Sequence, residues 1–294
     1  MSMKQLLILS GKGGTGKTTI ASAFIRLSEA TAYADCDVDS PNLHLISGWN
    51  IEPKRTDYCG LPRATIDPDL CIACDLCREH CRFSAISVGA DYRVNTLACE
   101  GCGVCEYVCP AGAIAMKPQV DGDLMLYADS DRAFSTARLN AGSGTSGLLV
   151  TQVKRQMQEK AGRASLAIID GSPGIGCPVI ASLSGVDLVL VVAEPSISGI
   201  SDLGRVIATA QTMGVETAIC VNKYDTNLEK TRCIEEFCRS RGLPFSGKIP
   251  YDAVTMQAIN QGISIVDIDC IAGTAVRKVY EETMQLLLGQ NDGE

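Results

Sequence analysis

A glycine-rich loop near the start of the chain constrains the fold more than any other feature. Residues 11–18 read G-K-G-G-T-G-K-T and satisfy the pattern G-x-x-x-x-G-K-[ST], with an apolar run at 4–10 before them and a helical pattern at 19–29 after them. Strand, loop and helix therefore come in the order that a phosphate-binding loop requires. In such a loop, backbone N–H groups surround phosphate oxygens, a lysine neutralises the β- and γ-phosphates, and a hydroxyl can ligate Mg²⁺.

The loop predicts a specific set of phosphate ligands. Lys17 takes the place of the phosphate lysine, and Thr18 takes the place of the Mg²⁺ ligand. The predicted binding residues are Gly11, Gly13, Gly14, Thr15, Gly16, Lys17, Thr18 and Thr19. A flexible glycine turn without a ligand is the alternative, and the flanking strand and helix argue against it.

Apolar strands alternate with amphipathic helices along most of the chain. We expect strands at 31–34, 165–169, 188–192, 218–221 and 245–249, and helices at 146–160, 199–213, 228–241 and 271–288. This alternation predicts an α/β fold with a doubly wound, mainly parallel sheet. In such sheets ligands bind at the carboxyl ends of the strands, which is where the glycine-rich loop lies.

Fifteen cysteines are unusual for a chain of 294 residues. The first ten residues show neither a basic region followed by a long apolar core nor a cleavage site, so we expect a cytoplasmic protein, in which disulfides are rare. Metal binding is then the better explanation. Eight of the cysteines form two runs of the pattern C-x₂-C-x₂-C-x₃-C, the second 28 positions after the first. The flanking residues repeat as well, which indicates an internal duplication.

The duplicated cysteine runs resemble a bacterial ferredoxin that carries two [4Fe-4S] clusters. By that resemblance, the fourth cysteine of each run ligates the cluster of the other run. The first cluster would have Cys71, Cys74, Cys77 and Cys109 as ligands, and the second would have Cys99, Cys102, Cys105 and Cys81. Zinc is the alternative, but structural zinc sites rarely use three closely spaced cysteines with a distant fourth.

The loop spelling K-G-G-T-G-K-T, with a second lysine at Lys12, resembles the deviant Walker A loop of the MinD/ParA/Mrp ATPases, a family that includes the nitrogenase iron protein. The resemblance implies an ATPase in which two subunits close face to face over nucleotide. Lys12 would then reach the phosphates bound by the partner and act like an arginine finger. It also implies a P-loop ATPase domain at 1–53 and 119–294, interrupted at 54–118 by a small α+β ferredoxin-like domain.

Two acidic segments resemble the switch regions of that family. Residues 35–42 read D-C-D-V-D-S-P-N, like switch I, and residues 170–174 read D-G-S-P-G, like the Walker B and switch II pattern D-x-x-P-G. The resemblance implies that Asp37 orients the attacking water and that Asp35 supports the Mg²⁺ shell. Asp170 would hold Mg²⁺ through water. Solvation at the surface is the alternative for each aspartate taken alone.

The base that the site selects is open between adenine and guanine. Residues 222–225 read N-K-Y-D, which matches the N-K-x-D pattern that selects guanine in GTPases. The spelling of the glycine-rich loop favours ATP, because in the resembled family an asparagine at this strand end, here Asn222, reads adenine. Pro250, after the last strand, would then pack on the base.

Seven cysteines lie outside the two runs. Cys36, Cys220 and Cys270 fall on or beside apolar strands and are interpreted as small core residues. Cys177 follows Asp170 by seven positions, and the nitrogenase iron protein has a ligand of its intersubunit cluster at a like distance after its switch II aspartate. A bridging metal site at Cys177, a redox thiol and a packed structural thiol all stay open, because no second cysteine for a bridging site is evident.

Charge and hydropathy exclude several classes of partner. The net charge of −8 lacks the basic footprint of a nucleic-acid-binding protein. No apolar run reaches the roughly 18 residues of a membrane helix, and the closing helix does not resemble the cationic membrane-targeting tail of MinD. We therefore expect neither nucleic-acid binding nor stable membrane association. The expected partners are a second copy of the chain or a paralogous ATPase, and a redox or metallocofactor protein.

Together these features predict an iron–sulfur protein that binds and hydrolyses ATP, with ATP, Mg²⁺ and two [4Fe-4S] clusters as cofactors. Switch I leads directly into the inserted domain, so nucleotide state and cluster position should be coupled. The leading hypothesis is that dimer closure drives electron transfer, or the assembly of a metal cofactor or iron–sulfur cluster. The alternative is a spatial organiser like MinD, or a redox sensor, in which the clusters are structural.

Overall fold

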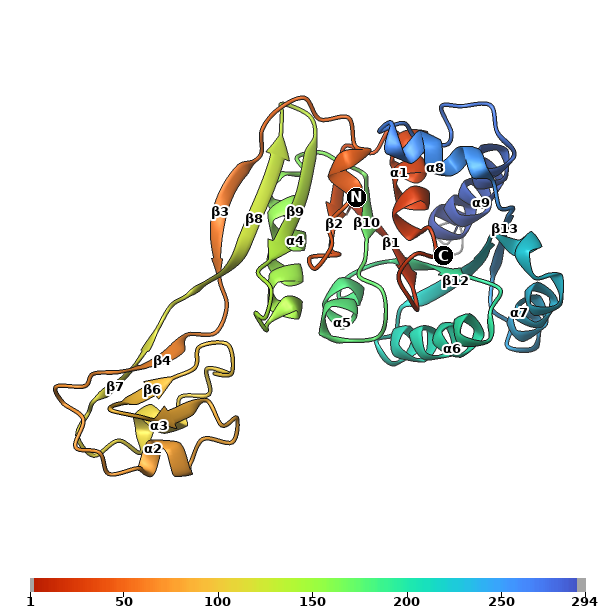
Figure 1. Ribbon diagram of the computed structural model, residues 1–294. Helices are drawn as coiled ribbons and strands as arrows, with labels where there is room; N and C mark the ends of the chain where they lie inside the picture. Colours follow the sequence, from red (N-terminus) through yellow and green to blue (C-terminus); the bar gives the residue numbers. More distant parts are fainter. Residues whose placement is uncertain (1–2, 290–294) are drawn as a thin grey trace.

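The computed structural model describes residues 3–289, and its main feature is one large twisted sheet (Figure 1). Its strands are β1 (Lys4–Ser10), β2 (Ala32–Asp35), β3 (Lys54–Cys59), β8 (Val120–Ala128), β9 (Ala133–Leu139), β10 (Leu166–Asp170), β11 (Leu188–Ala193), β12 (Glu216–Asn222) and β13 (Phe245–Ile249). The nine strands follow the order β13-β12-β11-β1-β10-β2-β9-β8-β3. Neighbours from β13 to β9 pair parallel, and β8 and β3 continue the sheet antiparallel at one edge.

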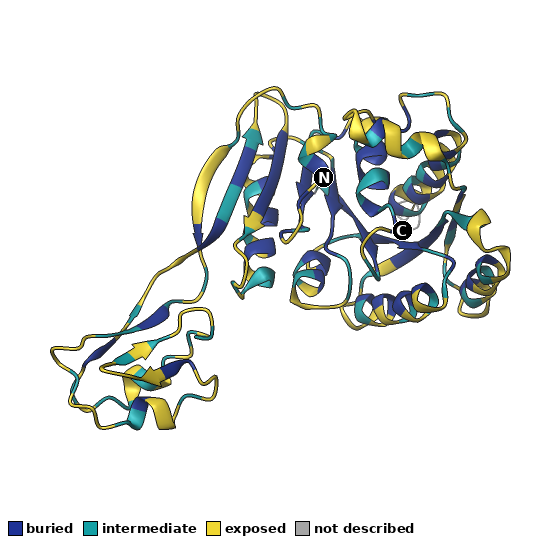
Figure 2. Ribbon diagram, in the orientation of Figure 1, coloured by how far each residue is buried: buried dark blue, intermediate teal, exposed yellow. Residues whose placement is uncertain are grey.

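Helices cover both faces of the large sheet. One face carries α4 (Ser146–Lys160), α5 (Cys177–Leu183), α6 (Ile197–Thr212) and α7 (Leu228–Ser240), and the other carries α1 (Lys17–Ser28), α8 (Ala253–Asn260) and α9 (Ile271–Leu288). Successive residues of β1 alternate between the two cores: Leu7 and Leu9 pack against the first group, and Leu6 packs against the second. The central strands are accordingly dark blue in Figure 2. Burial on both faces explains their continuous apolar sequences and confirms the predicted α/β fold.

Most of the predicted core elements lie where the sequence placed them. The helices expected at 146–160 and 271–288, and the strand expected at 245–249, have those bounds in the structure. The sequence did not predict α5 and α8, which are helices of seven and eight residues. Two single turns, η1 (Leu43–Leu45) and η2 (Tyr224–Thr226), complete the large unit. Among residues 3–289 no helix is both long and apolar enough to cross a membrane.

The large sheet extends further than the sequence indicated. β9 pairs parallel with β2, β8 pairs with β9, and β3 pairs with β8 in an antiparallel ribbon. Residues 54–59 therefore belong to the large sheet, although the expected insertion begins at residue 54. β3 is mostly exposed because it is an edge strand with one partner.

A small unit lies at the end of the β3–β8 ribbon (Figure 1). We call it the cysteine unit, because it carries the eight cysteines of the two runs. Its elements are β4 (Arg63–Ile66), α2 (Leu76–Glu79), β5 (Ile86–Val88), β6 (Tyr92–Val94), α3 (Val104–Tyr107) and β7 (Ile114–Lys117). β4 pairs with β7 and β5 pairs with β6, around a core of Ala64, Cys77, Ile86 and Ile114. The backbone repeats with the duplicated sequence: Asp75 before α2 and Gly103 before α3 are both left-handed, with φ of 66° and 73°. Four buried residues form a small core for such a unit.

A buried lysine joins α4 to α5. Lys154 Nζ donates to the carbonyls of Ser182 and Ser184 at 2.7 and 2.5 Å, near the end of α5. Burial lowers the pKa of Lys154 to about 8, although the nearby Cys36 thiol acts in the opposite direction. These hydrogen bonds satisfy carbonyl groups that the end of a short helix leaves unpaired.

We expect the Lys154 ammonium to make stability depend on pH. Between about pH 8 and 10.5 the folded protein releases this proton while the unfolded chain keeps it, so the free energy of unfolding rises with pH in that window. The gain relative to Lys154→Met should reach up to about 3 kcal/mol. Urea unfolding of both proteins at pH 7.5 and 10 measures it; parallel changes in the two proteins would show that Lys154 does not titrate in this way.

Candidate functional site

The glycine-rich loop lies between β1 and α1, at the carboxyl end of the middle strand of the parallel part of the sheet. Gly16 has φ of 91°, and a Cβ built on it would lie 2.3 Å from Asn222 Nδ2. Asn222 Nδ2 donates to the Thr15 carbonyl at 2.7 Å, and Lys223 Nζ donates to the Gly14 carbonyl at 3.1 Å. The end of β12 therefore holds the loop in shape, and only glycine fits at position 16.

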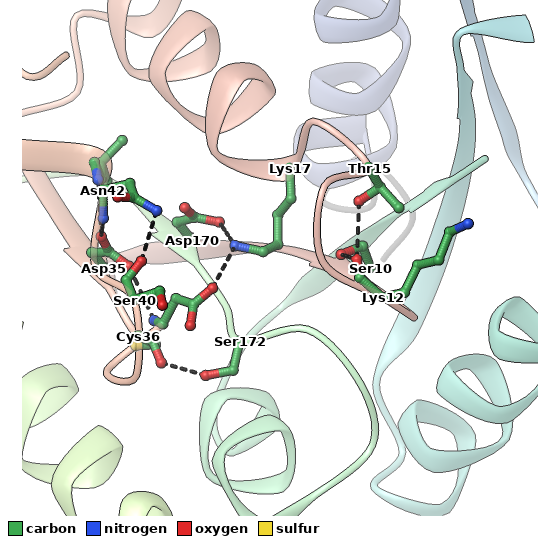
Figure 3. A network of polar contacts seen from close by, with 12 residues as sticks. Ser10, Lys12, Thr15, Lys17, Asp35, Cys36, Ser40, Asn42, Asp170 and Ser172 are labelled. Atoms are coloured by element: carbon green, nitrogen blue, oxygen red, sulfur yellow. Dashed lines mark hydrogen bonds and ion pairs between the residues drawn. The ribbon is translucent and has the colours of Figure 1, made fainter. Parts of the chain in front are cut away.

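Lys17 is the centre of a buried cluster of charges (Figure 3). Its Nζ lies 2.5 Å from Asp170 Oδ1 and 3.9 Å from Asp37 Oδ2. Burial alone would lower the pKa of Lys17, but the Asp170 carboxylate, followed by Asp35 and Asp37, raises it above its usual value. Lys17 thus stays charged and joins the phosphate loop to both predicted switch segments.

Asp170 has the free ligand atom that a cation site needs. Its side chain is fully buried, and within the described part of the chain its Oδ2 atom has no hydrogen-bond partner. Thr18 lies in the same cavity wall as Lys17, one residue further along. Mg²⁺ prefers oxygen ligands, and a buried carboxylate oxygen and a threonine hydroxyl are both such donors. The residues present therefore fit the ion that the sequence predicted here.

Asp35 organises the first switch segment. Its Oδ1 accepts the Asp37 N–H at 3.0 Å, and its Oδ2 accepts the N–H groups of Asn42 and Leu43 at 2.9 and 3.0 Å. Burial, followed by the nearby Asp170 charge, raises the pKa of Asp35 to about 7. Both oxygens are thus engaged by backbone. The expected contribution of Asp35 to a Mg²⁺ shell stays a prediction.

Asp37 and the second switch segment lie next to Lys17. Burial raises the pKa of Asp37, while Lys17 opposes that shift. The Ser172 hydroxyl donates to the Cys36 carbonyl at 2.5 Å and ties the two switch segments together. The Gly174 N–H donates to the Ser10 carbonyl at 3.0 Å. A phosphate oxygen could accept a hydrogen bond from this N–H only if the bond to the Ser10 carbonyl broke.

A cavity of about 480 Å³ opens beside the loop and is large enough for a nucleotide. Pro250 and Tyr251 line it, as does Asn222, whose neighbour in β13 is Ile249. The expected contact of Pro250 with a base stays a prediction. Asp225, the last residue of the N-K-Y-D segment, accepts the Tyr251 N–H at 2.7 Å and so fixes this wall.

Sequence reasoning missed part of this cavity. Thr255, Met256 and Ile259 of α8 line it, together with Leu45 from η1. The signal for α8 was weak because it is a helix of eight residues in which only Ala258 is fully buried. The side chains of Met256 and Ile259 give the cavity an apolar wall, which suits a purine base.

Lys12 does not point into its own phosphate site. Its Nζ lies 2.9 Å from Glu194 Oε2 and 3.2 Å from Ser196 Oγ, and Figure 3 shows the side chain directed away from Lys17. The lysine is only partly buried at the end of β11. The expected role of Lys12 in a partner's site stays a prediction.

The eight cysteines of the two runs line two separate pockets in the cysteine unit. One pocket has Cys71, Cys74, Cys77 and Cys109 in its wall, and the other has Cys81, Cys99, Cys102 and Cys105. Each pocket thus combines three cysteines of one run with the last cysteine of the other. Cys81 Sγ and Cys109 Sγ accept the N–H groups of Ala85 and Ala113, both at 3.3 Å.

The thiols are spread around the pocket walls. Among residues 3–289, no three or more histidine, cysteine, aspartate or glutamate side chains converge closely enough to bind one metal ion. All fifteen cysteines are free of disulfides. Burial raises the pKa of Cys77 and of Cys105, so these thiols favour the protonated form and would release protons on binding a metal.

The remaining cysteines mostly serve the core. Cys36 and Cys220 are fully buried, as expected, and burial raises the pKa of each to about 12. Cys270 is half-buried and caps α9, where its Sγ accepts the Gly273 N–H at 3.2 Å. Cys177 is exposed at the first position of α5. Its role as a bridging ligand stays a prediction.

Fold and loop together define a P-loop nucleotide-binding protein with a doubly wound sheet. Residues 6–265 match the CobQ/CobB/MinD/ParA nucleotide binding domain, so the chain belongs to that family. It is an ATPase of the MinD/ParA type.

Three known proteins show the extent of the similarity. An uncharacterized protein of Methanocaldococcus jannaschii, MJ0578, is 31% identical in an alignment of 290 positions that covers 96% of this chain and 97% of that protein. The iron-sulfur cluster carrier protein of Pyrococcus abyssi is 22% identical in an alignment of 306 positions that covers 97% of this chain and 86% of that protein. The solved structure of MinD with Mg-ADP from Pyrococcus horikoshii has a TM-score of 0.59 at 17% identity and covers 99% of this chain and 100% of its own, which shows a shared fold.

Gly16 and Gly13 offer a matched test of the loop geometry. We expect Gly16→Ala to destabilise the nucleotide-free protein by about 1–3 kcal/mol, because the new Cβ meets Asn222 in a left-handed backbone. Gly13→Ala should cost little, since no atom lies within 4 Å of a Cβ built there. Urea unfolding without nucleotide compares the two variants, and equal midpoints would contradict the bracing by Asn222.

Proposed function

We propose that this ATPase couples nucleotide-driven dimer closure to electron delivery through two [4Fe-4S] clusters in an inserted domain. The observation that carries the proposal is the pair of four-cysteine pockets, each formed by both cysteine runs. The partner protein would use these electrons either for a low-potential reaction or for the assembly of a metal cofactor.

The donor sets suit clusters better than single ions. A zinc ion needs its thiolates within about 2.3 Å of one point, whereas a [4Fe-4S] cube takes one thiolate at each of four separate irons. Each pocket wall combines three closely spaced cysteines of one run with a distant fourth from the other run, a combination that structural zinc sites rarely use and that clusters of bacterial ferredoxins do use. Backbone N–H bonds to the sulfurs of Cys81 and Cys109 would stabilise the thiolates.

The inserted domain begins after the β3–β8 ribbon. β4 and β7 pair with each other and share a core with β5, separate from the large sheet. We therefore place the domain at about residues 60–119, rather than at 54–118. Its core is so small that cluster ligation would supply much of its stability.

ATP binding must rearrange the charges around Lys17. The ammonium group now neutralises Asp170 and Asp37, and it would instead face the β- and γ-phosphates. Bound Mg²⁺ would supply the positive charge that balances both the phosphates and the Asp170 carboxylate. Asp37 would then be free to orient the attacking water. Because Ser172 is bonded to the backbone at Cys36, the two switches would move together.

Closure of the dimer over nucleotide would bring together two copies of this chain, or this chain and a paralogous ATPase. In the dimer, Lys12 would leave Glu194 and compensate phosphate charge in the partner's site. Asn222 and Pro250 would flank adenine. The bond from Tyr251 to Asp225 already occupies one oxygen of the carboxylate that would otherwise read guanine, which favours ATP.

Two other functions share these residues. The similarity to an iron-sulfur cluster carrier protein favours release of clusters to an acceptor when ATP turns over. The similarity to MinD favours a spatial organiser with structural or redox-sensing clusters. Transfer of labelled iron to an apo-acceptor would identify the carrier, and ATP-dependent binding to lipid vesicles would identify the organiser.

ATP should accelerate electron transfer from the reduced protein. We expect Mg-ATP to raise the rate of reduction of a low-potential dye at least about fivefold over Mg-ADP, because a coupling free energy of 1–3 kcal/mol corresponds to 5–150-fold. Lys12→Ala should bind ATP but lose the acceleration. Stopped-flow absorbance under anaerobic conditions measures both.

Lys278→Ala is the matched control, since Lys278 is exposed on α9, outside the cavity. It should behave like the unaltered protein. Equal rates in all nucleotide states would refute the coupling, and an Lys12→Ala protein with full acceleration would refute the role of Lys12.

A further inference from the structure

The two halves of the cysteine unit have different surroundings. We call residues 95–103, which contain the first two cysteines of the second run, the inner loop, and the matching residues 67–75 the outer loop. A Cβ built on Gly101 of the inner loop would lie 2.5 Å from the carbonyl of Pro62, in the segment between β3 and β4. We call this segment, together with the β3–β8 ribbon, the stem. The matching outer-loop residue is Ala73, with φ of 55°. The inner loop therefore has glycine at the position that contacts the stem, and the outer loop has alanine at the matching position.

The inner loop also touches the ATPase unit. Leu97 Cδ2 lies 3.4 Å from a Cβ built on Gly142, and Glu100 Oε2 lies 3.9 Å from one built on Gly144. These glycines belong to residues 140–145, the contact loop between β9 and α4. Leu97 is still 70% exposed, so the contact is small and can open or tighten. In the outer loop Leu70 and Ile72 are 53% and 66% exposed.

Hydrogen bonds fasten the contact loop to the stem of the cysteine unit. The Tyr58 hydroxyl donates to Thr145 Oγ1 at 2.9 Å, and the Ser143 hydroxyl donates to Asp121 Oδ1 at 3.2 Å. The other oxygen of Asp121 accepts the Gly60 N–H at 3.0 Å. Asp121 is only 2% exposed, and its charge is paired with Arg63 at 3.6 Å. A shift of the contact loop would therefore move the stem.

The first switch and the helix α5 contact the residues on either side of the contact loop. The Leu139 N–H, just before the loop, donates to the Val38 carbonyl of the first switch at 2.9 Å. Gly147, just after it, packs on Cys177, and a Cβ there would lie 3.1 Å from Cys177 Cβ. Cys177 begins α5, which directly follows the second switch. By contrast, the covalent path from the first switch to the cysteine unit runs through β3, at the far edge of the sheet.

We propose that nucleotide binding reaches the cysteine unit through the contact loop and acts first on the inner loop. The pocket of Cys81, Cys99, Cys102 and Cys105 is then the nucleotide-sensitive centre, and the pocket of Cys71, Cys74, Cys77 and Cys109 faces the partner protein. This assignment rests on the proposed function for the contents of the pockets. Tyr58 acts in it as a positioning residue.

Hydrogen exchange of the anaerobically reconstituted full chain tests the route. Mg-ATP should change the exchange rate of inner-loop amides at least threefold and leave the outer loop unchanged. Tyr58→Phe, which lacks the hydroxyl bonded to Thr145, and Gly147→Ala, which pushes α4 from Cys177, should each lose the inner-loop response while the response of residues 11–18 remains. Gly204→Ala is the matched control in α6, with no atom within 4 Å of the new Cβ, and should keep the full response.

The opposite results would overturn the route. Equal responses of the two loops, no response in either, or a full inner-loop response in both Tyr58→Phe and Gly147→Ala would each contradict it. The two proposals fail separately: acceleration of electron transfer without an inner-loop response refutes only the route. An inner-loop response without acceleration supports the route and refutes electron delivery.

Discussion

The ion pair between Lys17 and Asp170 is the interaction on which the nucleotide site depends. It is buried, its Nζ and Oδ1 atoms are 2.5 Å apart, and it joins the phosphate loop to the second switch. Removing one partner of a buried pair leaves a charge without compensation, at a cost of about 3–5 kcal/mol. Phosphate and a divalent cation can replace both partners at once. The pair thus holds the switches in one arrangement until nucleotide arrives.

The cysteine unit lies outside this charge cluster but is connected to it by hydrogen bonds and packing contacts around the contact loop. The residues on either side of the contact loop touch the nucleotide site: Leu139 at the end of β9 donates a hydrogen bond to Val38 of the first switch, and Gly147 at the start of α4 packs on Cys177 of α5. The buried Lys154 joins α4 to the end of α5 by two hydrogen bonds. A small unit on a two-stranded stem then responds to movements at its base. Interfaces of this kind turn small shifts into larger displacements.

The sequence predicted the elements that are buried on both faces. β1, β10 and β11 are continuous apolar runs, and each lies between two parallel neighbours. β3 was missed because it is an exposed edge strand with the sequence K-R-T-D-Y-C. β8 is buried only in part and carries Asp121, Gly122 and Asp123 near its start, so its apolar pattern is weak.

The candidate site was predictable where chemistry fixes both residue type and spacing. The structure places most of the phosphate-loop residues in the wall of one cavity, and it places each crossed set of four cysteines around one pocket. Contacts between distant segments were not predictable. Nothing in the sequence pairs Lys12 with Glu194, or Asp225 with the backbone of Tyr251, because each contact depends on how parallel strands bring loop ends together.

The iron content of paired cysteine variants tests most directly whether the two runs share their clusters. The account predicts about eight irons per chain in the unaltered protein and in Cys59→Ala, whose thiol lies outside both pockets, and about four in Cys71→Ala or Cys109→Ala. The double variant Cys71→Ala with Cys109→Ala should still retain about four irons, since both residues serve one pocket. Loss of all iron in that double variant, or zinc in place of iron in the unaltered protein, would contradict the account.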